Sequence, residues 1–213
     1  MLSTVHVVDD DASFQTAIRR RLELAGYAVQ VYSSAEQFLD QQPPDNQSGC
    51  LLLDVQLPGL SGLALQSRLR EAGSKLPIVF ISGRAEIPTT VSAIKAGAED
   101  FLIKPVASGD LLPAIERAIA RQDALQKNQS ELDLQRSRVA SLTPRERQVC
   151  DLMVRGKHNK QIASELGPTV RTIKAHRHRV MEKMQVESLA ELVAIAERLD
   201  RHSFLRAAGV SGP

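Results

Sequence analysis

The 213-residue sequence predicts an α/β first half, built on a five-stranded parallel doubly wound sheet, and an all-α second half of four helices. Two observations predict this fold class. In residues 1–120, short apolar runs alternate with helical segments, which is typical of a sheet with helices on both faces. In residues 141–213, helix start and stop signals follow one another directly. A polar helical segment, residues 121–140, continues the last helix of the first half and joins the two halves.

Five short and mainly apolar runs predict the strands of the sheet. Such runs are typical of strands that are buried on both faces of a parallel sheet. Because parallel strands share one direction, their carboxyl ends meet at one edge, where ligands of these folds gather. The predicted strands are Val5–Val8, Ala28–Tyr32, Leu51–Leu53, Ile78–Ile81 and Phe101–Ile103.

Capping residues indicate the helices of the first half. A helix over residues 12–24 is closed by Gly26, and Asp11 before it supplies a negative charge that the helix dipole favours. The run Ser33-Ser34-Ala35-Glu36 predicts a capping box that opens the second helix. The third and fourth helices are bounded by Ser61-Gly62 and Gly73, and by Pro88 and Gly97.

Polar and charged residues close four of the predicted strands. Asp9 and Asp10 follow the first strand, Asp54 the third, Ser82 the fourth and Lys104 the fifth. Three carboxylates at one edge repel one another unless a cation lies among them, and hard oxygen ligands suit Mg²⁺. A strand-end aspartate by itself is commonly the N-cap of the next helix. The ordered set of acids, hydroxyl and amine instead indicates a site that holds a phosphoryl group on Asp54.

The first half resembles a two-component receiver domain, which has a flavodoxin-like fold. The resemblance covers residues 1–120 and implies that a sensor histidine kinase phosphorylates Asp54. Two departures are mild: Leu57 stands where the family often has Met, and Ser82 is the shorter of the two usual hydroxyl residues. The matching segments are VHVVDDD (5–11), LLLDVQLPGLSG (51–62), IVFISGRAE (78–86) and AGAEDFLIKP (96–105).

The same resemblance implies a metal site beside the phosphoacceptor Asp54. Asp10 would bind Mg²⁺, or Mn²⁺, directly, whereas Asp9 would act mainly through water. The backbone carbonyl of Gln56 would be a further ligand. We read Asp11 as a charge at a helix N-terminus rather than as a ligand.

The receiver resemblance also implies a switch. Ser82 and Lys104 would move onto the oxygens of the new phosphoryl group, and Phe101, three residues before the lysine, would turn inward. The surface from the fourth helix to the fifth strand would then change and pair two receivers. A homodimer on phosphorylation is therefore expected, as an equilibrium shifted by the modification.

The fifth helix is predicted to run beyond the receiver pattern, from Ser108 to about Val139. Apolar residues recur along it every seven positions, but the companion heptad positions are mostly polar, which is too weak for an independent coiled coil. Two interpretations stay open: a solvated helical linker, or an extended helix whose apolar stripe supports a dimer. The stripe consists of Leu111, Ala118, Leu125, Leu132 and Val139, with Ile115, Gln122, Gln129 and Arg136 as companions.

Charge separates the two halves of the chain. Residues 1–140 hold 14 Lys and Arg against 17 Asp and Glu, whereas residues 141–213 hold 13 against 8. The second half alone is therefore expected to meet a polyanion. No apolar run approaches about 18 residues, and no signal-peptide pattern opens the chain, which predicts a cytoplasmic protein without a membrane segment. Cys50 and Cys150 lie in apolar contexts and are expected to be reduced core thiols.

Four helices are indicated in the second half. Thr143 is the N-cap of the first, with Pro144 at its first position and Glu146 at its third, and Gly156 ends it. Helices over residues 159–166, 169–184 and 188–201 follow, and Gly167-Pro168 forms the turn between the first two of these. Two short helices joined by a glycine turn, the second of them basic, are the layout of a helix-turn-helix.

The helix over residues 169–184 carries cations opposite a core-facing side formed by Ile173, Val180 and Met184. A charge run on a helix is usually a solvated face. Directly after a helix-turn signature, the same run indicates contact with DNA. Its cations are Arg171, Lys174, Arg177, Arg179 and Lys183.

The segment LTPRERQVCDLMVRGKHNKQIASELGPTVRTIKAHRHRVMEKM (142–184) resembles the LuxR-type helix-turn-helix of the NarL/FixJ regulators. The resemblance extends to about residue 199 and implies that the domain binds double-stranded promoter DNA. Pro168 replaces a usual aliphatic residue in the turn, and Glu187 occupies a position that is often basic. The implied base-edge contacts are Lys174, Ala175 and His178, and the implied phosphate contacts are Asn159, Lys160, Thr172, Arg177 and Arg179.

Together the two resemblances identify the chain as a member of the FixJ-like response regulators. Such a regulator is expected to activate transcription with RNA polymerase, and its only chemistry is Mg-dependent self-phosphorylation and autodephosphorylation at Asp54. Two other classes fit less well. A phosphoaspartate enzyme would need a substrate pocket and a second acid, for which no further domain is available. A receiver with an RNA-binding or protein-sequestering output would need interleaved aromatic residues, of which residues 141–213 contain one.

Overall fold

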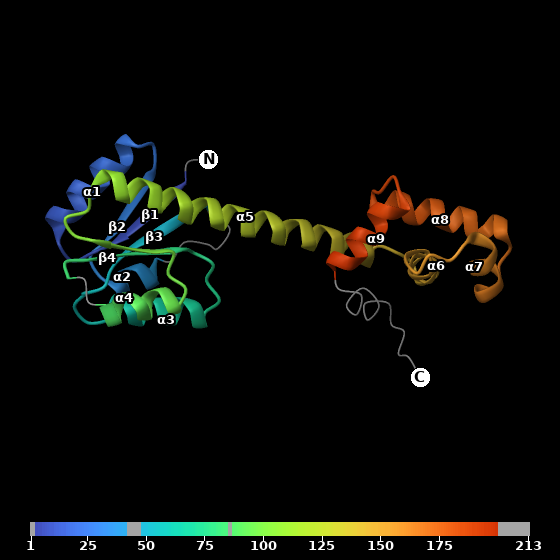
Figure 1. Ribbon diagram of the computed structural model, residues 1–213, viewed down its shortest axis with the longest axis horizontal. Coiled ribbons are helices and arrows are strands. Elements are labelled where there is room, and N and C mark those ends of the chain that lie inside the picture. Colours follow the sequence, from blue (N-terminus) through green and yellow to red (C-terminus); the bar gives the residue numbers. More distant parts are fainter. Residues whose placement is uncertain (1–2, 42–47, 85–86, 200–213) are drawn as a thin grey trace. The chain divides into compact units, whose positions relative to one another are not determined.

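The computed structural model of the protein describes residues 3–41, 48–84 and 87–199. The chain forms two compact units, Met1–Gln126 and Lys127–Pro213. The boundary between the units falls inside one long helix, α5 (Ser108–Ala140), so this helix contributes to both (Figure 1).

The first unit contains a parallel sheet in the strand order β2-β1-β3-β4-β5, which is the flavodoxin-like order. The register pairs Val8 of β1 with Leu53 of β3, so the residues after these two lie side by side at the carboxyl edge. This edge is therefore where the predicted strand-end set gathers. The strands are β1 (Thr4–Val8), β2 (Ala28–Tyr32), β3 (Gly49–Asp54), β4 (Ile78–Ser82) and β5 (Asp100–Ile103).

Helices cover both faces of the sheet, as the alternation of strands and helices predicted (Figure 1). On one face, Ile18 and Leu22 of α1 and Leu111 of α5 pack on Val7 and other strand residues. The opposite face carries a second core around Phe38 of α2, joined by side chains of α3 and α4. The helices are α1 (Ala12–Leu24), α2 (Ala35–Asp40), α3 (Gly62–Glu71) and α4 (Ile87–Lys95), with α5 following β5.

The start of α2 differs from the predicted capping box by one residue. The N-cap is Ser34, whose Oγ accepts a hydrogen bond from the Gln37 N–H at 3.2 Å. Gln37 Oε1 accepts in turn from the Ser33 N–H at 2.7 Å. Glu36, the predicted partner of Ser33, accepts instead from the Leu60 N–H at 3.0 Å. Either of the two consecutive serines could cap the helix. Because the Glu36 carboxylate binds the Leu60 N–H, which is distant in sequence, the helix begins after Ser34 instead of Ser33.

The apolar stripe of α5 is divided between the cores of the two units. Leu111 and Ala118 are buried in the first core, whereas Val139 is buried in the second and Leu132 packs against it. Leu125, between these pairs, is 57% exposed. Most of the stripe therefore packs within the chain, and little of it is left to support a dimer.

The second unit is a bundle in which the end of α5 packs with four further helices around one aliphatic core. Its first helix has the predicted capping box, since Thr143 and Glu146 each bind the other's backbone. The last helix begins after Ser188 as predicted and ends at Arg198, while Arg201 lies outside the described residues. The four helices are α6 (Pro144–Val154), α7 (Asn159–Leu166), α8 (Val170–Met184) and α9 (Leu189–Arg198).

Within residues 3–41, 48–84 and 87–199, no helix combines the length and the apolar character that crossing a membrane requires. Cys50 and Cys150 are both free and buried, one in each unit. Burial raises the pKa of each thiol to about 12, so both are unreactive side chains of the two cores.

Candidate functional site

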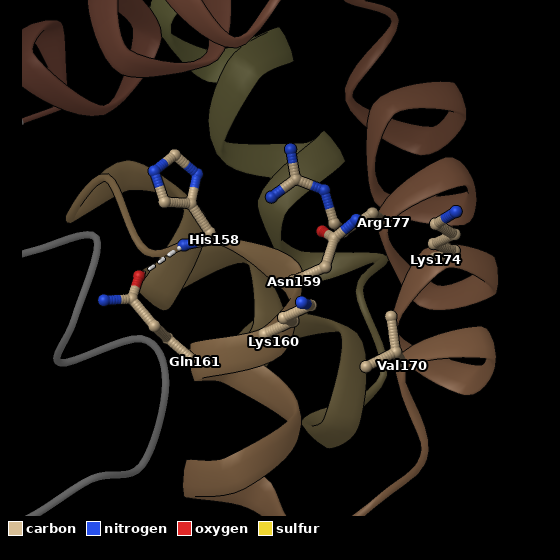
Figure 2. A pocket seen from close by; sticks show the side chains of 7 residues that line it. All are labelled: His158, Asn159, Lys160, Gln161, Val170, Lys174 and Arg177. Atoms are coloured by element: carbon tan, nitrogen blue, oxygen red, sulfur yellow. Dashed lines mark hydrogen bonds between the residues drawn. The ribbon is translucent and has the colours of Figure 1, made fainter.

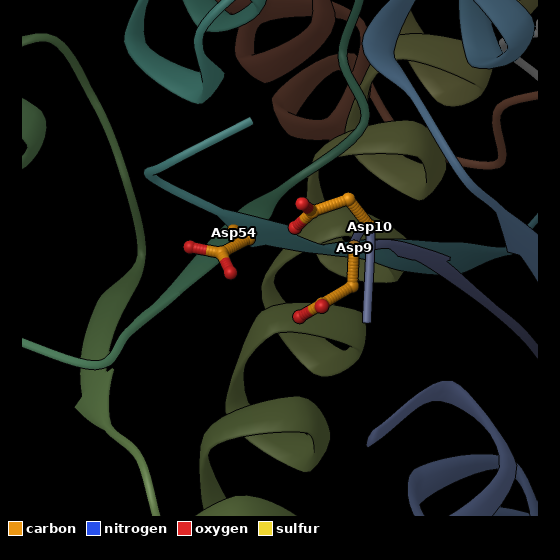
Figure 3. Close-up of side chains that lie close together, drawn as sticks. All are labelled: Asp9, Asp10 and Asp54. Carbon is orange, nitrogen blue, oxygen red and sulfur yellow. The ribbon is translucent and has the colours of Figure 1, made fainter. Parts of the chain in front are cut away.

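The carboxyl edge of the sheet brings three aspartates together (Figure 3). Asp9 and Asp10 follow β1, and Asp54 ends the adjacent strand β3. One carboxylate oxygen from each of the three lies within 4.8 Å of the others. The neighbouring register of β1 and β3 therefore produces the acidic cluster that the sequence predicted.

The three carboxylates differ in burial and in hydrogen bonding. Asp9 and Asp54 are buried, whereas Asp10 is exposed at the rim. Asp9 Oδ1 accepts from the Asp11 N–H at 3.0 Å, and Asp54 Oδ1 accepts from the Gln56 N–H at 2.9 Å. These backbone donors hold one oxygen of each buried carboxylate in place, which leaves the other oxygen of each for a cation.

Lys104 supplies that cation in this structure. Its Nζ donates to Asp9 Oδ2 and to Asp54 Oδ2, each at 2.6 Å. Burial lowers the pKa of Lys104, but the hydrogen bonds to Asp54 and Asp9 outweigh it, and the net pKa is raised. For Asp9 burial dominates, and its pKa is raised in spite of the bond from Lys104. The lysine is thus a fixed positive charge beside the predicted phosphoacceptor.

Ser82 ends β4, whereas Phe101 lies inside β5, and the two side chains have different environments. Ser82 is buried, and its Oγ donates to the Arg84 carbonyl at 2.9 Å and accepts from the Arg84 N–H at 3.2 Å. The hydroxyl is therefore bonded to its own loop. Phe101 is half-buried, with its ring centroid 6.3 Å from that of Phe80. Both side chains would have to move for the predicted switch.

Two residues of α1 belong to the site although sequence reasoning missed them. The Phe14 ring centroid lies 4.3 Å from Lys104 Nζ, a cation–π contact. Gln15 Nε2 donates to the carbonyls of Asp9 at 2.5 Å and of Tyr32 at 2.9 Å, which ties the ends of β1 and β2 together. Helical periodicity places Phe14 on the core-facing side of α1, because it lies one turn before the buried Ile18, but it does not say that Phe14 meets Lys104.

The acidic cluster fits a hard divalent cation such as Mg²⁺. The donors are carboxylate oxygens, and the exposed side of Asp10 leaves room for the waters that Mg²⁺ retains. Asp9, Asp10 and Asp54 would hold the ion, which would neutralise charge on phosphoryl oxygens when bound. Lys104 supplies a second positive charge beside Asp54.

A second candidate site lies on α7 and α8 of the other unit. An open pocket is lined by residues from the start of α7 and from one side of α8 (Figure 2). Four of the predicted DNA contacts, Asn159, Lys160, Lys174 and Arg177, line this pocket together. Sequence reasoning missed its other lining residues, which are His158, Gln161 and Val170.

Helix α8, the predicted DNA-contacting helix, has the two sides that the sequence predicted. Ile173, Val180 and Met184 are fully buried, so the helix packs through this side on the core of its own unit. Asn159 and Arg177 are half-buried. The remaining predicted contacts are exposed: Lys160, Thr172, Lys174, Ala175, His178 and Arg179.

Lys183, the last cation of α8, binds two groups within its own unit. Its Nζ donates to Glu146 Oε2 at 2.7 Å and to the Ser141 carbonyl at 3.1 Å. The bond from Lys183, together with those from Thr143, lowers the pKa of Glu146 to about 2. The basic run therefore divides into an exposed part and one residue that joins α8 to the start of α6.

Comparison with known proteins identifies both units. Residues 5–116 match the family described as "Response regulator receiver domain", and residues 140–196 match "Bacterial regulatory proteins, luxR family". Response regulator protein TodT of Pseudomonas putida is 41% identical over 199 residues, which cover 92% of this chain and 86% of TodT. Transcriptional regulatory protein FixJ of Bradyrhizobium diazoefficiens is 40% identical over 194 residues, 91% of this chain and 94% of FixJ. The chain belongs to the NarL/FixJ family of two-component response regulators.

Solved structures of other response regulators agree with the fold of this one. The response regulator StyR superposes with a TM-score of 0.87 at 43% identity, covering 93% of this chain and 100% of StyR. Full-length FixJ from B. japonicum gives a TM-score of 0.58 at 40% identity, covering 92% of this chain and 97% of FixJ. The response regulator thus combines a receiver domain with a LuxR-type DNA-binding domain, and it regulates transcription.

Proposed function

We propose that a sensor histidine kinase phosphorylates Asp54 of this response regulator, and that the modification controls homodimerisation and DNA binding. The observation that carries the proposal is the position of Lys104, whose Nζ bonds both Asp54 and Asp9. A carboxylate nucleophile beside a fixed cation and a metal-binding carboxylate, Asp10, suits phosphoryl transfer. Mg²⁺ or Mn²⁺ would be held by Asp9, Asp10, Asp54 and the Gln56 carbonyl.

The proposed switch is based on the hydrogen bond of Ser82 and the ring contact of Phe101. A phosphoryl group on Asp54 adds strong acceptor oxygens next to Lys104. Ser82 Oγ would leave the Arg84 carbonyl for one of these oxygens, which vacates space near β4. Phe101 would then turn inward from its half-buried position against Phe80.

Dimerisation is supported by an exposed apolar side of α4. Ile87, Val91 and Ile94 recur at helical spacing and are 79%, 43% and 45% exposed. Ile103 of β5, the strand beside α4, is 52% exposed. We call Ile87, Val91, Ile94 and Ile103 the α4 face. An exposed apolar set of this size is typical of a surface that meets another protein, here a second copy of the receiver.

We also propose a domain organisation for the chain and an effect on transcription. We propose a receiver domain of residues 1–120, a linker helix of 121–140 and a DNA-binding domain of 141–213. Dimeric regulators would bind adjacent half-sites of promoter DNA and activate transcription through RNA polymerase. The reaction at Asp54 would be limited to self-phosphorylation and autodephosphorylation. The buried reduced thiols and the DNA target support a cytoplasmic location.

Sedimentation of the full-length protein tests the coupling to assembly. Beryllofluoride, a phosphoryl mimic, is expected to shift the wild-type protein from monomer to dimer in the presence of Mg²⁺. Val91→Glu should prevent the shift, because it places a charge in the centre of the α4 face, where a dimer would desolvate it. Leu24→Glu is the matched control, since Leu24 is 81% exposed at the end of α1 and outside that face.

An unchanged monomer at tens of micromolar, with beryllofluoride bound, would remove dimerisation from the proposal. Equal dimerisation of Val91→Glu and wild type would move the interface away from the α4 face. Either result would leave the assignment of Asp54 as phosphoacceptor in place.

Base reading by the recognition helix is tested with two substitutions. Lys174 and His178 lie one turn apart on the exposed side of α8, with the small Ala175 beside them. Lys174→Ala is expected to lose about 1–3 kcal/mol at the cognate site and to relax the preference at one base pair. Arg179→Ala is expected to weaken all duplexes about equally and to reduce the salt slope by about one ion.

Titration of cognate and scrambled duplexes at several salt concentrations separates these effects. Equal weakening of both duplexes by Lys174→Ala would make Lys174 a phosphate contact. The base-reading side of α8 would then have to be assigned to other residues.

A further inference from the structure

The end of the recognition helix α8 differs from the other helix ends of this protein. In the described part of the chain, six helices are followed by a residue with a left-handed backbone, and five of these residues are glycine. The sixth is Gln185, with φ of 53°, directly after α8. A left-handed backbone is unfavourable for a residue with a side chain. Glycine would adopt this backbone conformation at a lower cost in free energy, which directs attention to the contacts of the Gln185 side chain. The five glycines are Gly26, Gly73, Gly97, Gly156 and Gly167.

That side chain binds the linker helix. Gln185 Oε1 accepts a hydrogen bond from the guanidinium of Arg138, which lies in the last turn of α5. The same guanidinium donates to the carbonyl of Met184 at 3.4 Å. Met184 is the last residue of α8, and its carbonyl has no partner within the helix. Arg138 thus places a positive charge at the negative end of the α8 dipole.

The end of α5 is docked on this unit by three further contacts. Val139 is buried in the core of the unit, and its carbonyl accepts from Arg147 of α6 at 3.1 Å. Glu131, two turns earlier, pairs with Arg198 of α9 at 3.2 Å. These contacts keep the helix end in place, so loss of the Arg138 bonds should leave the unit folded. The Arg138 bonds are the hydrogen bonds from α5 itself that reach α8, and the bond from Lys183 to the Ser141 carbonyl joins α8 to the residue just after α5.

We propose that Arg138 and Gln185 are positioning residues that couple the linker helix to the recognition helix. We call their mutual bond, with the bond to the Met184 carbonyl, the Arg138–Gln185 clamp. Through this clamp, a change in the orientation of α5 turns α8 relative to the rest of the second unit. The turn changes the position of Lys174 relative to the bound DNA. This inference rests on the proposed control of DNA binding by phosphorylation.

The test measures an activation ratio on the full-length protein. The ratio compares affinity with and without beryllofluoride for one duplex, enriched from a random-sequence library by the activated wild type. Coupling between sites in proteins gives ratios of roughly 5- to 150-fold. Arg138→Ala and Gln185→Gly are each expected to lower the wild-type ratio by about fivefold, because Arg138→Ala removes both bonds of the clamp and Gln185→Gly removes the bond between the two side chains.

Two further variants separate coupling from stability. Gln185→Glu keeps an acceptor oxygen for Arg138 and should retain the wild-type ratio. Arg136→Ala removes an arginine from the same turn of α5 that pairs with Asp133 of its own helix, and it should also retain the ratio. Gln185→Gly relieves the left-handed backbone, so its melting temperature should not fall. A lowered ratio without lowered stability is a result that a merely structural role would not produce.

A full activation ratio in both Arg138→Ala and Gln185→Gly would overturn the clamp. Weaker DNA binding by the same factor with and without beryllofluoride would also overturn it, since Gln185 would then be a direct DNA contact. A wild-type ratio of one would instead reject the proposed control by phosphorylation. The two failures are therefore distinguishable.

Discussion

Acetyl phosphate with Mg²⁺ is expected to add a hydroxylamine-labile phosphoryl group to the protein, and Asp54→Asn is expected to abolish this labelling. The amide cannot act as the nucleophile, and no other carboxylate of the cluster has the same surroundings. Asp9 is fully buried and Asp10 lies exposed at the rim, whereas Asp54 is 5% exposed. Labelling is measured by intact mass and by release with hydroxylamine.

Two variants accompany this measurement. Asp11→Asn is the matched control, because Asp11 caps α1 with its side chain and asparagine caps a helix equally well. It should be labelled like the wild type. Lys104→Ala should be labelled but should not form dimers, since in the proposed switch the lysine binds the new phosphoryl oxygens. Undiminished labelling of Asp54→Asn would mean that another residue is the phosphoacceptor.

The receiver domain is expected to lose stability on mild acidification because of one buried histidine. His6 of β1 is 1% exposed, and burial lowers its pKa from 6.5 to about 4. In the unfolded chain the imidazole takes up a proton below pH 6.5, whereas the folded protein resists protonation until about pH 4. Stability is therefore complete above pH 6.5 and falls between these values, by about 2 kcal/mol at pH 5 and about 3 kcal/mol below pH 4.

His6→Leu should remove this part of the pH dependence. The Tyr32 hydroxyl donates to Gln30 Oε1 at 2.9 Å, so it accepts from His6 Nδ1, 3.1 Å away, and keeps its own partner when His6 is replaced. Urea unfolding at several pH values can be followed by tyrosine fluorescence. The protein has two tyrosines, Tyr27 and Tyr32, and both lie in the receiver domain.

The difference between wild type and His6→Leu isolates the histidine, because the carboxylates that also titrate are shared by both proteins. Parallel curves of unfolding free energy against pH would show that His6 does not contribute.

The strand-end set of the receiver could be predicted because it depends on position along each strand. Asp54, Ser82 and Lys104 each stand at the end of an apolar run, and parallel strands bring such ends to one edge. Phe14 and Gln15 were missed, since nothing in the helical pattern of α1 says which strand end a half-buried side chain will meet. The sheet order decides that, and it places α1 beside Lys104 and Tyr32.

The helix starts of the second unit were also readable from local sequence. A capping box such as Thr143 with Glu146 closes within three residues, so its partners are adjacent in the chain. The start of α2 shows the limit of this rule. There either Ser33 or Ser34 could be the N-cap, and the Glu36 carboxylate accepts a hydrogen bond from the Leu60 N–H, 24 residues away.

The sequence by itself determined the order of the elements, the two domain families and the residues at the strand ends and on the exposed side of α8, because these follow from short periods and from neighbouring residues. Only the tertiary structure decided which partners the long polar side chains take. Lys183 bonds Glu146 across 37 residues, and Arg138 bonds Gln185 across 47. Such pairs depend on which helix sides meet when the core closes. The apolar stripe of α5 is shared between two cores for the same reason.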